Sequence, residues 1–414
     1  MQKRGILVGG VLLFFEKGKE LIMMPMLILH LGIAGYGIYM QIALIGSILS
    51  IFTTCGMNIS ILRYYHLNRN ELTISLRIII FSSILAGGFW LLTGRWFIHI
   101  FNLPIETLYL SFVIAILISL KVIFFGYYRA SEQYNKILYY FTSFEIIEVC
   151  ALGSFSFTHY SVDIIKIISI FIWIRILPIL LSILDIRPKI FQKEIQSVIW
   201  SRMLFGISFI PKDLFLWLGH SADRFLISYM MGPASVGIYA SIYKIASIVK
   251  FVSQPVTFTA FPELAKAWDS CNYNQFNIQK WKTAGLYLLF SLPVFLLFLF
   301  APIHMLACLS KELMNTRGLL IWISLGLMIH TIQVLTGYYI YVFSNKVLKY
   351  TIMLSAINVM GLLGQYFLLL EWRLIGAAFG SFLIYFILWM VVVIDSANLN
   401  KNHFFPKGVV RNEL

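Results

Sequence analysis

The sequence predicts an all-α integral membrane protein in which twelve transmembrane helices form two six-helix bundles related by an internal repeat. Three observations predict this fold: an apolar composition, a segregation of basic residues between loops, and a duplicated segment. The 414 residues are 60% hydrophobic and only 12% charged, with a mean hydropathy of +0.84. A soluble chain carries about 25% charged residues, so a membrane is the expected solvent.

The duplicated segment comprises residues 31–48, which recur as residues 231–248. The identical pairs are Gly32/Gly232, Ala34/Ala234, Gly37/Gly237, Ile38/Ile238, Tyr39/Tyr239, Ile42/Ile242, Ile45/Ile245, Ser47/Ser247 and Ile48/Ile248. A second match relates residues 126–140 to residues 337–350 with a one-residue slip. Both matches run in the same direction at nearly the same offset, and transporters are often built from such repeats. The expected bundles are residues 1–195 and 196–414.

Apolar stretches of about 18 residues or more, each able to cross about 30 Å of hydrocarbon, fill the chain. The predicted spans are 5–28, 37–62, 77–98, 107–129, 137–157, 161–184, 202–230, 236–261, 283–307, 318–341, 348–370 and 374–395. Almost nothing remains for a soluble domain. The first span is too long, too charged and too poor in small-residue cleavage sites for a signal peptide.

Basic residues lie mainly in alternate loops, and the opposite loops hold only Lys311, Arg317 and Arg373. Because positive charge is retained in the cytoplasm, both termini are expected there. An odd number of spans would spoil this segregation, which supports twelve. The net charge of +14 therefore reflects membrane topology, and no nucleic-acid partner is expected.

Motifs for other chemistry are missing from the sequence. The four cysteines form no CxxC pair or metal-ligand spacing, and the eight histidines form no HExxH motif. No GxxxxGK[ST] segment indicates ATP binding. We therefore predict no catalytic residue, no metal and no cofactor.

Ionisable residues inside the predicted spans are the candidates for function, because each costs roughly 2.5–3.5 kcal/mol at the centre of a bilayer unless it is paired or hydrated. Once the residues assigned to the loops, Arg202 among them, are set aside, the basic ones are Lys17, Lys19, Arg95, Lys121, Lys166, Arg175, Lys212, Arg224, Lys244 and Lys250. The acidic ones are Glu16, Glu20, Glu145, Glu148, Asp163, Asp213 and Asp223. The surplus of positive charge favours an anionic cargo, above all a phosphate or diphosphate.

Two alternatives apply to parts of this set. Residues 16, 17, 19 and 20 spread over roughly 160° of one helix, so local salt bridges between them are the structural alternative to lining a cavity. Arg95, Asp163, Lys166 and Arg224 lie close to predicted span ends, where long side chains reach the membrane interface.

The segment Asp223-Arg224-Phe225-Leu226-Ile227, followed by Gly232 and Gly237-Ile238-Tyr239-Ala240, resembles a stretch of bacterial polysaccharide flippases. Its counterpart, Leu31-Gly32 followed by Tyr36-Gly37-Ile38-Tyr39, matches the family's first such stretch. These O-antigen and capsule repeat-unit (Wzx-type) translocases belong to the superfamily that includes MATE multidrug exporters. Length, span number and duplication extend the resemblance over essentially the whole chain.

The resemblance implies a V of two bundles, with spans one, two, seven and eight around a central cavity. Span two departs from the charge pattern, since it holds only uncharged polar groups between Tyr36 and Leu62. Family members are thought to flip an undecaprenyl-diphosphate-linked oligosaccharide to the periplasmic leaflet by alternating access, coupled to protons or sodium. The implied location is the bacterial inner membrane, and the implied partners are the lipid-linked substrate, the bilayer, and polymerase and chain-length proteins of the same pathway.

We assign two sets of site residues. Expected substrate-binding residues are Lys17, Lys19, Arg175, Lys212, Arg224, Lys244 and Lys250. Expected ion-coupling residues are Glu16, Glu20, Glu145, Glu148 and Asp213. The alternative functions are a MATE-like exporter of small molecules and a membrane polymerase or glycosyltransferase. The short outside connection from about 308 to 317 argues against the enzyme, which usually has a long extracytoplasmic loop.

Overall fold

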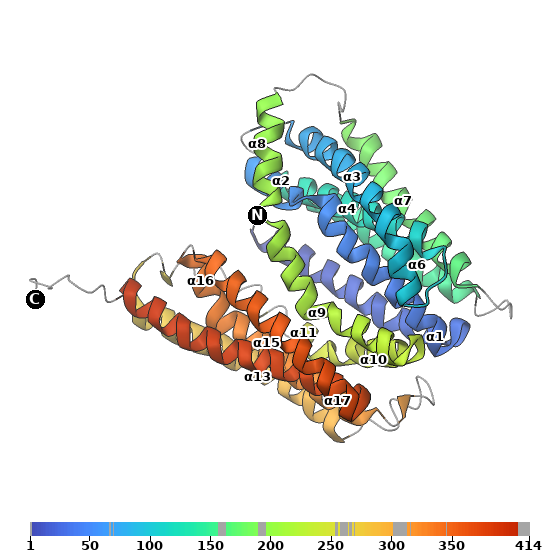
Figure 1. The fold of residues 1–414 in the computed structure, drawn as a ribbon. Helices are drawn as coiled ribbons and strands as arrows, with labels where there is room; N and C mark the ends of the chain where they lie inside the picture. The colour runs from blue at the N-terminus through green and yellow to red at the C-terminus, as the bar shows by residue number, and fades with distance from the viewer. Residues whose placement is uncertain are drawn as a thin grey trace, which may run out of the picture. The chain divides into compact units, whose positions relative to one another are not determined.

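The fold is all-helical over the residues that the computed structural model describes, namely 2–65, 68, 70–155, 163–188, 196–252, 256, 264, 267–268, 270–300, 313–314, 316–344 and 346–404. Within these helices, side chains are described except for residues 2–14, 16, 17, 155, 252 and 400–404. The chain divides into two compact units, Met1–Ala240 and Ser241–Leu414 (Figure 1). Among the described residues, eight helices are long and apolar enough to cross a membrane, which confirms a multi-pass membrane protein.

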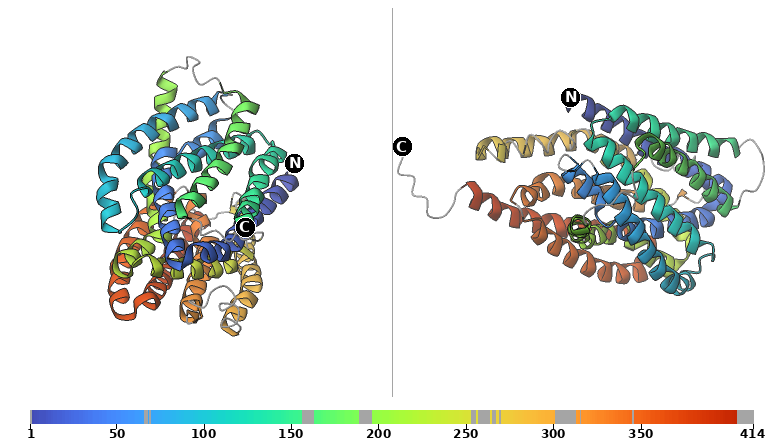
Figure 2. Two further views of the ribbon diagram at one scale, coloured as in Figure 1. Left: turned by 90° about the vertical axis from the view of Figure 1, so that its right-hand side faces the viewer. Right: turned by 90° about the horizontal axis from the view of Figure 1, so that it is seen from above.

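The helices of the first unit are α1 (Gln2–Thr54), α2 (Met57–Tyr64), α3 (Glu71–Ile100), α4 (Thr107–Ala130), α5 (Tyr134–Ile137), the π-helix η1 (Leu138–Thr142), α6 (Ser143–Phe155), α7 (Ile164–Ile186), α8 (Gln196–Ile207), α9 (Ile210–Met231) and the start of α10 (Pro233–Ala246). Within this unit α4 packs against α1, α2, α3 and α7, and α1 also packs against α6 (Figure 2). The unit is thus a bundle with α1 and α4 at its centre.

The second unit contains the end of α10, α11 (Ile248–Val252), α13 (Tyr273–Phe300), α15 (Arg317–Gln333), the π-helix η3 (Val334–Tyr338), α16 (Tyr339–Phe343) and α17 (Val347–Phe404). Here α15 packs against both α13 and α17. The Gln365 amide donates to the Ala377 carbonyl at 2.7 Å and to the Ser381 hydroxyl at 3.0 Å. These bonds join the two segments of α17 on either side of Arg373.

The two longest helices each break where the sequence predicts a loop between spans. Gly32 has φ 68° and ψ 173° inside α1, and Arg373 has φ 50° and ψ −135° inside α17. Gly232, the repeat partner of Gly32, ends α9 with nearly the same dihedrals, φ 81° and ψ 176°. Only glycine adopts this backbone region at low cost, so the duplicated sequence specifies the same break twice. The count of twelve spans and the bundles 1–195 and 196–414 stay predictions.

Several helix starts differ from the predicted limits, as two examples show. Helix α13 begins at Tyr273 and α8 at Gln196, several residues before the predicted starts at 283 and 202. The extra turns carry lysine and glutamine, which lower the mean hydropathy below that of a span without preventing helix formation. A hydropathy window therefore locates the apolar part of each helix and not its end.

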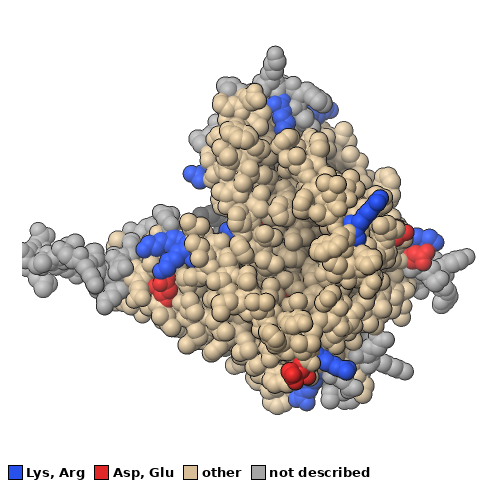
Figure 3. Space-filling model, in the orientation of Figure 1, with Lys and Arg blue, Asp and Glu red and all other residues tan. Residues whose placement is uncertain are grey.

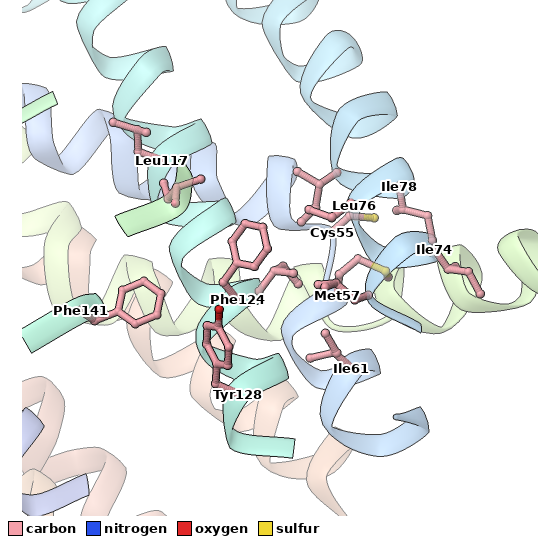
Figure 4. Packing of buried hydrophobic residues seen from close by; sticks show 14 of the residues in the cluster. Cys55, Met57, Ile61, Ile74, Leu76, Ile78, Leu117, Phe124, Tyr128 and Phe141 are labelled. Atoms are coloured by element: carbon pink, nitrogen blue, oxygen red, sulfur yellow. The ribbon is translucent and has the colours of Figure 1, made fainter. Parts of the chain in front are cut away.

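The core of the first unit is a cluster contributed mainly by α2, α3 and α4 (Figure 4). Met57, Ile61 and Phe124 are buried within it. Outside such clusters, large apolar side chains such as Leu92 and Met360 are 83% and 72% exposed. On the face drawn in Figure 3 charged side chains are few and scattered. An apolar exterior of this kind is the surface expected to face lipid.

Candidate functional site

Five ionisable side chains from four helices of the first unit form an ion-pair network. Glu148 of α6 contacts Arg175 of α7 at 2.6 Å (Nε to Oε1) and Lys19 of α1 at 2.6 Å (Nζ to Oε2). Glu145, also on α6, pairs with Lys121 of α4 at 2.8 Å and with Lys19. Lys19 therefore joins the two carboxylates, and we call these five residues the Lys19 network.

The network is buried to different degrees. The side chain of Glu148 is 3% exposed, and those of Lys19 and Glu145 are 10% and 12% exposed. Lys121 and Arg175 are 34% and 35% exposed. Three cations and two carboxylates leave one surplus positive charge among these five members. Burial of charge is tolerated here because each ion contacts an ion of opposite charge. The net positive charge, together with the more exposed Lys121 and Arg175, can attract a further anion.

Local sequence explains how the two carboxylates come to share a face. Glu145 and Glu148 lie three residues apart on α6, so their side chains project in nearly the same direction. The π-helix η1 directly precedes α6. A π-helical turn accommodates an extra residue and rotates everything after it, and such turns often occur at functional sites. The turn thus sets the direction in which both carboxylates point.

A tyrosine from the duplicated segment adjoins this network. The Tyr39 hydroxyl lies within hydrogen-bonding reach of the Arg175 guanidinium. Its ring packs edge-on against Phe171 with centroids 6.3 Å apart. The repeat partner Tyr239 instead donates a hydrogen bond from its hydroxyl to Asp223 Oδ2 at 2.7 Å. The same residue of the repeat therefore contacts a cation in one copy and a carboxylate in the other.

The other predicted site residues lie elsewhere. Arg224 is buried beside Asp223 and donates from Nη1 to the His220 carbonyl at 3.2 Å. Lys212 pairs with its neighbour Asp213 at 3.7 Å near the start of α9. Glu20 follows Lys19 on α1 and is half-buried. Lys244 and Lys250 lie in the second unit, on α10 and α11, and the side chains of Glu16 and Lys17 are outside the described residues.

The duplicated glycines meet each other inside the first unit. A Cβ placed on Gly37 would lie 2.8 Å from the carbonyl carbon of Pro233 and 3.0 Å from the nitrogen of Gly237. A Cβ on Gly237 would lie 3.1 Å from the carbonyl carbon of Ile33. The contact is reciprocal, since residue 37 meets residue 233 and residue 237 meets residue 33. Helices α1 and α10 therefore cross backbone to backbone.

Hydrogen bonds continue this contact along α9. The Gln41 amide donates to the Ser228 hydroxyl, and the Trp217 indole donates to the Ser47 hydroxyl at 2.8 Å. Both bonds link α1 to α9. The part of α1 after Gly32 is thus fastened to residues 217–237 by polar and backbone contacts.

A second buried ion pair fastens α8 to the same bundle. Glu71, with 0% exposure, accepts from Arg202 Nε at 3.2 Å and from the Ser60 hydroxyl at 2.8 Å. The Arg202 guanidinium also lies 3.5 Å from the centre of the Tyr64 ring. Sequence reasoning placed Arg202 among the loop cations and did not single out Glu71, because both residues stand at the edge of an apolar stretch.

Sequence reasoning also missed two matching triads. In the first unit Asp185 accepts from the Tyr128 hydroxyl at 3.1 Å and from Lys136 at 2.6 Å. In the second unit Asp395 accepts from the Tyr341 hydroxyl at 2.6 Å and from Lys349 at 2.5 Å. Tyrosine and lysine are separated by eight residues in both cases and lie within the second matching segment of the repeat, although that match pairs Tyr128 with Tyr339 and Lys136 with Lys346. The repeat alignment therefore does not indicate the second triad, and both aspartates lie outside the matching segments.

Long apolar helices define a multi-pass membrane protein, and ionisable groups kept within such helices usually serve a pathway for a substrate or an ion. The chain belongs to the polysaccharide biosynthesis protein family, whose model matches residues 3–268. This confirms the resemblance to polysaccharide flippases of the MATE-containing superfamily. No curated protein sequence shows significant similarity to the chain.

Solved structures with the same fold are transporters and a flippase. A lipid II flippase, MurJ, in an inward closed conformation superposes with a TM-score of 0.71 at 15% identity, covering 96% of this chain and 90% of that one. An inward-facing multidrug resistance MATE transporter of the MOP superfamily gives 0.70 at 14% identity, with 95% of each chain covered. An outward-facing multidrug resistance MATE transporter of the MOP superfamily superposes with a TM-score of 0.62 at 13% identity, covering 97% of this chain and 96% of that one. The fold of the MATE and MurJ proteins is thus present over nearly the whole chain.

Proposed function

We propose that the protein is a flippase that moves an undecaprenyl-diphosphate-linked oligosaccharide, an O-antigen or capsule repeat unit, from the cytoplasmic to the periplasmic leaflet of a bacterial inner membrane. The Lys19 network is the observation that carries this proposal. The proposal includes twelve spans in two related bundles, cytoplasmic termini, alternating access and coupling to an ion.

Energetics support transport of an anion. Ionisable groups within spans are costly, and those that persist there usually serve a pathway for a substrate or an ion. The network holds a guanidinium and two ammonium groups, the usual protein ligands of phosphate oxygens. A diphosphate on a lipid carrier is therefore a suitable cargo, and the polysaccharide biosynthesis family gives that carrier its biological context.

The proposal separates the predicted site residues into groups. Lys19 and Arg175 bind the diphosphate directly from the network, and Lys17, Lys212, Arg224, Lys244 and Lys250 contribute positive potential along the path. Glu16, Glu20, Glu145, Glu148 and Asp213 remain the candidates for carrying the coupling ion. Polymerase and chain-length proteins of the pathway act on the product after translocation.

Deletion of the gene in the organism that encodes it tests the function. We expect loss of surface polysaccharide and accumulation of the undecaprenyl-diphosphate-linked unit in lipid extracts, measured by gel electrophoresis and mass spectrometry. A plasmid that carries the wild-type gene should restore the polysaccharide, and plasmids that encode the Lys19→Met or Arg175→Met variant should not. Lys166→Met, which removes an exposed lysine of α7, is the matched control. Unchanged polysaccharide in the deletion strain would contradict the proposal.

The second candidate is a MATE-like exporter, and the fold similarity to multidrug transporters favours it. It predicts that the deletion strain keeps its polysaccharide and becomes more sensitive to amphiphilic drugs. Minimum inhibitory concentrations measured in the same strains separate the two functions. Higher drug sensitivity with unchanged polysaccharide indicates an exporter, and loss of polysaccharide indicates a flippase.

A further inference from the structure

The two carboxylates of the Lys19 network occupy the cations that an anionic cargo needs. Lys19 contacts both Glu145 and Glu148, Lys121 contacts Glu145, and Arg175 contacts Glu148. In this arrangement an incoming diphosphate meets cations that already have partners. The closest contact between its oxygens and the two ammonium groups requires that the oxygens replace a carboxylate.

The geometry distinguishes the two glutamates. Glu148 is 3% exposed and receives both the Arg175 Nε at 2.6 Å and the Arg175 Nη2 at 3.4 Å. A guanidinium holding both oxygens of a carboxylate is the more directional and stronger pairing. Glu145 is 12% exposed and is held by two ammonium groups, one of them on Lys121, which is 34% exposed. Ammonium groups act as point charges on flexible stems, so Glu145 is the carboxylate that can be exchanged.

We propose that Glu145 is an internal counter-ion whose place on Lys19 and Lys121 is taken by the diphosphate of the cargo, and that Lys121 is a third substrate-binding cation. The inference rests on the proposed flippase function and deepens it. In the empty protein Glu145 keeps both lysines paired within the membrane. When the diphosphate binds, it accepts from these lysines, and Glu148 continues to hold Arg175 in position.

Counter-ion exchange lets one site both bind and release its cargo. A site with three bare cations would hold a diphosphate too tightly to let it go, whereas a competing carboxylate lowers the affinity and still leaves the network with a net positive charge that attracts the anion. Removing the competitor should therefore strengthen binding and slow release. Removing Lys121 should weaken binding.

The test measures anion binding by the purified full-length protein in nanodiscs. Calorimetric titration with inorganic pyrophosphate, and separately with a prenyl diphosphate, is compared for wild type, Glu145→Gln, Lys121→Met and the double variant. We expect Glu145→Gln to bind about tenfold more tightly, the change that corresponds to about 1.4 kcal/mol. Lys121→Met should bind more weakly, and the double variant should return towards wild type because its net charge matches that of the wild-type network. Lys166→Met is the control for a lysine of α7 outside the network.

Each result decides the question. If Glu145→Gln binds both ligands more tightly than wild type, the result supports exchange of Glu145 with the diphosphate group itself. If only the prenyl diphosphate binds more tightly, the result supports exchange with a diphosphate that is attached to a lipid. Equal or weaker binding by Glu145→Gln, or no binding by any variant, overturns the inference. Restoration of surface polysaccharide by the wild-type gene is scored separately, so the flippase function survives that failure. Size-exclusion profiles of all variants verify folding, and the double variant provides a second test if Glu145→Gln alone is unstable.

Discussion

The crossing of α1 and α10 at Gly37 and Gly237 gives a prediction whose size follows from the geometry. A Cβ on Gly37 would lie 2.8 Å from the Pro233 carbonyl carbon and closer still to its oxygen. Carbon atoms in favourable contact are about 3.5–4.0 Å apart, so Gly37→Ala requires the helices to separate by roughly 1 Å. Because the obstacle is backbone, no side chain can rotate away. Overpacking of this kind costs about 1–3 kcal/mol.

The assay is thermal unfolding of the detergent-solubilised protein, followed by tryptophan fluorescence. Gly37→Ala and Gly237→Ala should each lower the unfolding midpoint. The double variant should lose less than the sum, because one separation of the helices relieves both clashes. Gly18→Ala on the same helix meets nothing within 4 Å and should be neutral or slightly stabilising, since alanine favours helix over glycine. The reasoning is refuted if Gly37→Ala is as stable as Gly18→Ala.

Three further predictions use the same unfolding assay. Gly32→Ala meets no atom within 4 Å but must adopt φ 68°, so it should lower stability by about 1–3 kcal/mol through backbone strain alone, and a neutral result would show that the break relaxes freely. Arg202→Met leaves the fully buried Glu71 without its ion pair and should cost about 3–5 kcal/mol, whereas adding Glu71→Leu should recover part of that loss; equal losses in both variants would contradict the ion pair's role. Asp185→Asn and Asp395→Asn each weaken a tyrosine–lysine triad and should destabilise to a similar extent, about 1–3 kcal/mol, with strongly unequal effects counting against equivalence of the triads.

The sequence was sufficient for the parts of the fold that depend on hydropathy and on glycine. Apolar stretches located most of the long helices, because every membrane-spanning segment must be long and apolar, whereas the predicted span 202–230 is divided between α8 and α9. The repeated glycines at 32 and 232 marked two breaks with one backbone conformation. Helix ends were less predictable, as in α13, where a polar first turn continues an apolar span. Helix formation there depends on backbone propensity, which a hydropathy window does not measure.

The candidate site was predictable in its members and not in its pairings. The free-energy cost of placing a charge in the membrane singled out Lys19, Glu145, Glu148 and Arg175. The three-residue spacing of the two glutamates placed them on one face of a helix. Which lysine would meet which glutamate depends on how four helices pack, and one sequence does not contain that information. Lys121 was therefore recorded as an intramembrane cation and not assigned to the site, although it contacts Glu145 directly.

The duplicated tyrosines show how a repeat can keep its scaffold and change its chemistry. Gly37 and Gly237 contact each other reciprocally, so the two copies of this segment are similar in their packing as well as in their sequence. Two residues further on, Tyr39 reaches Arg175 and Tyr239 donates to Asp223. A phenol can serve both roles because its oxygen accepts a hydrogen bond from a cation and its O–H group donates one to a carboxylate. A tyrosine at this position is therefore compatible with a cation as its partner in one copy and with an anion in the other. The five residues of the Lys19 network lie outside the duplicated segments, so the similarity between the copies alone does not reveal the network.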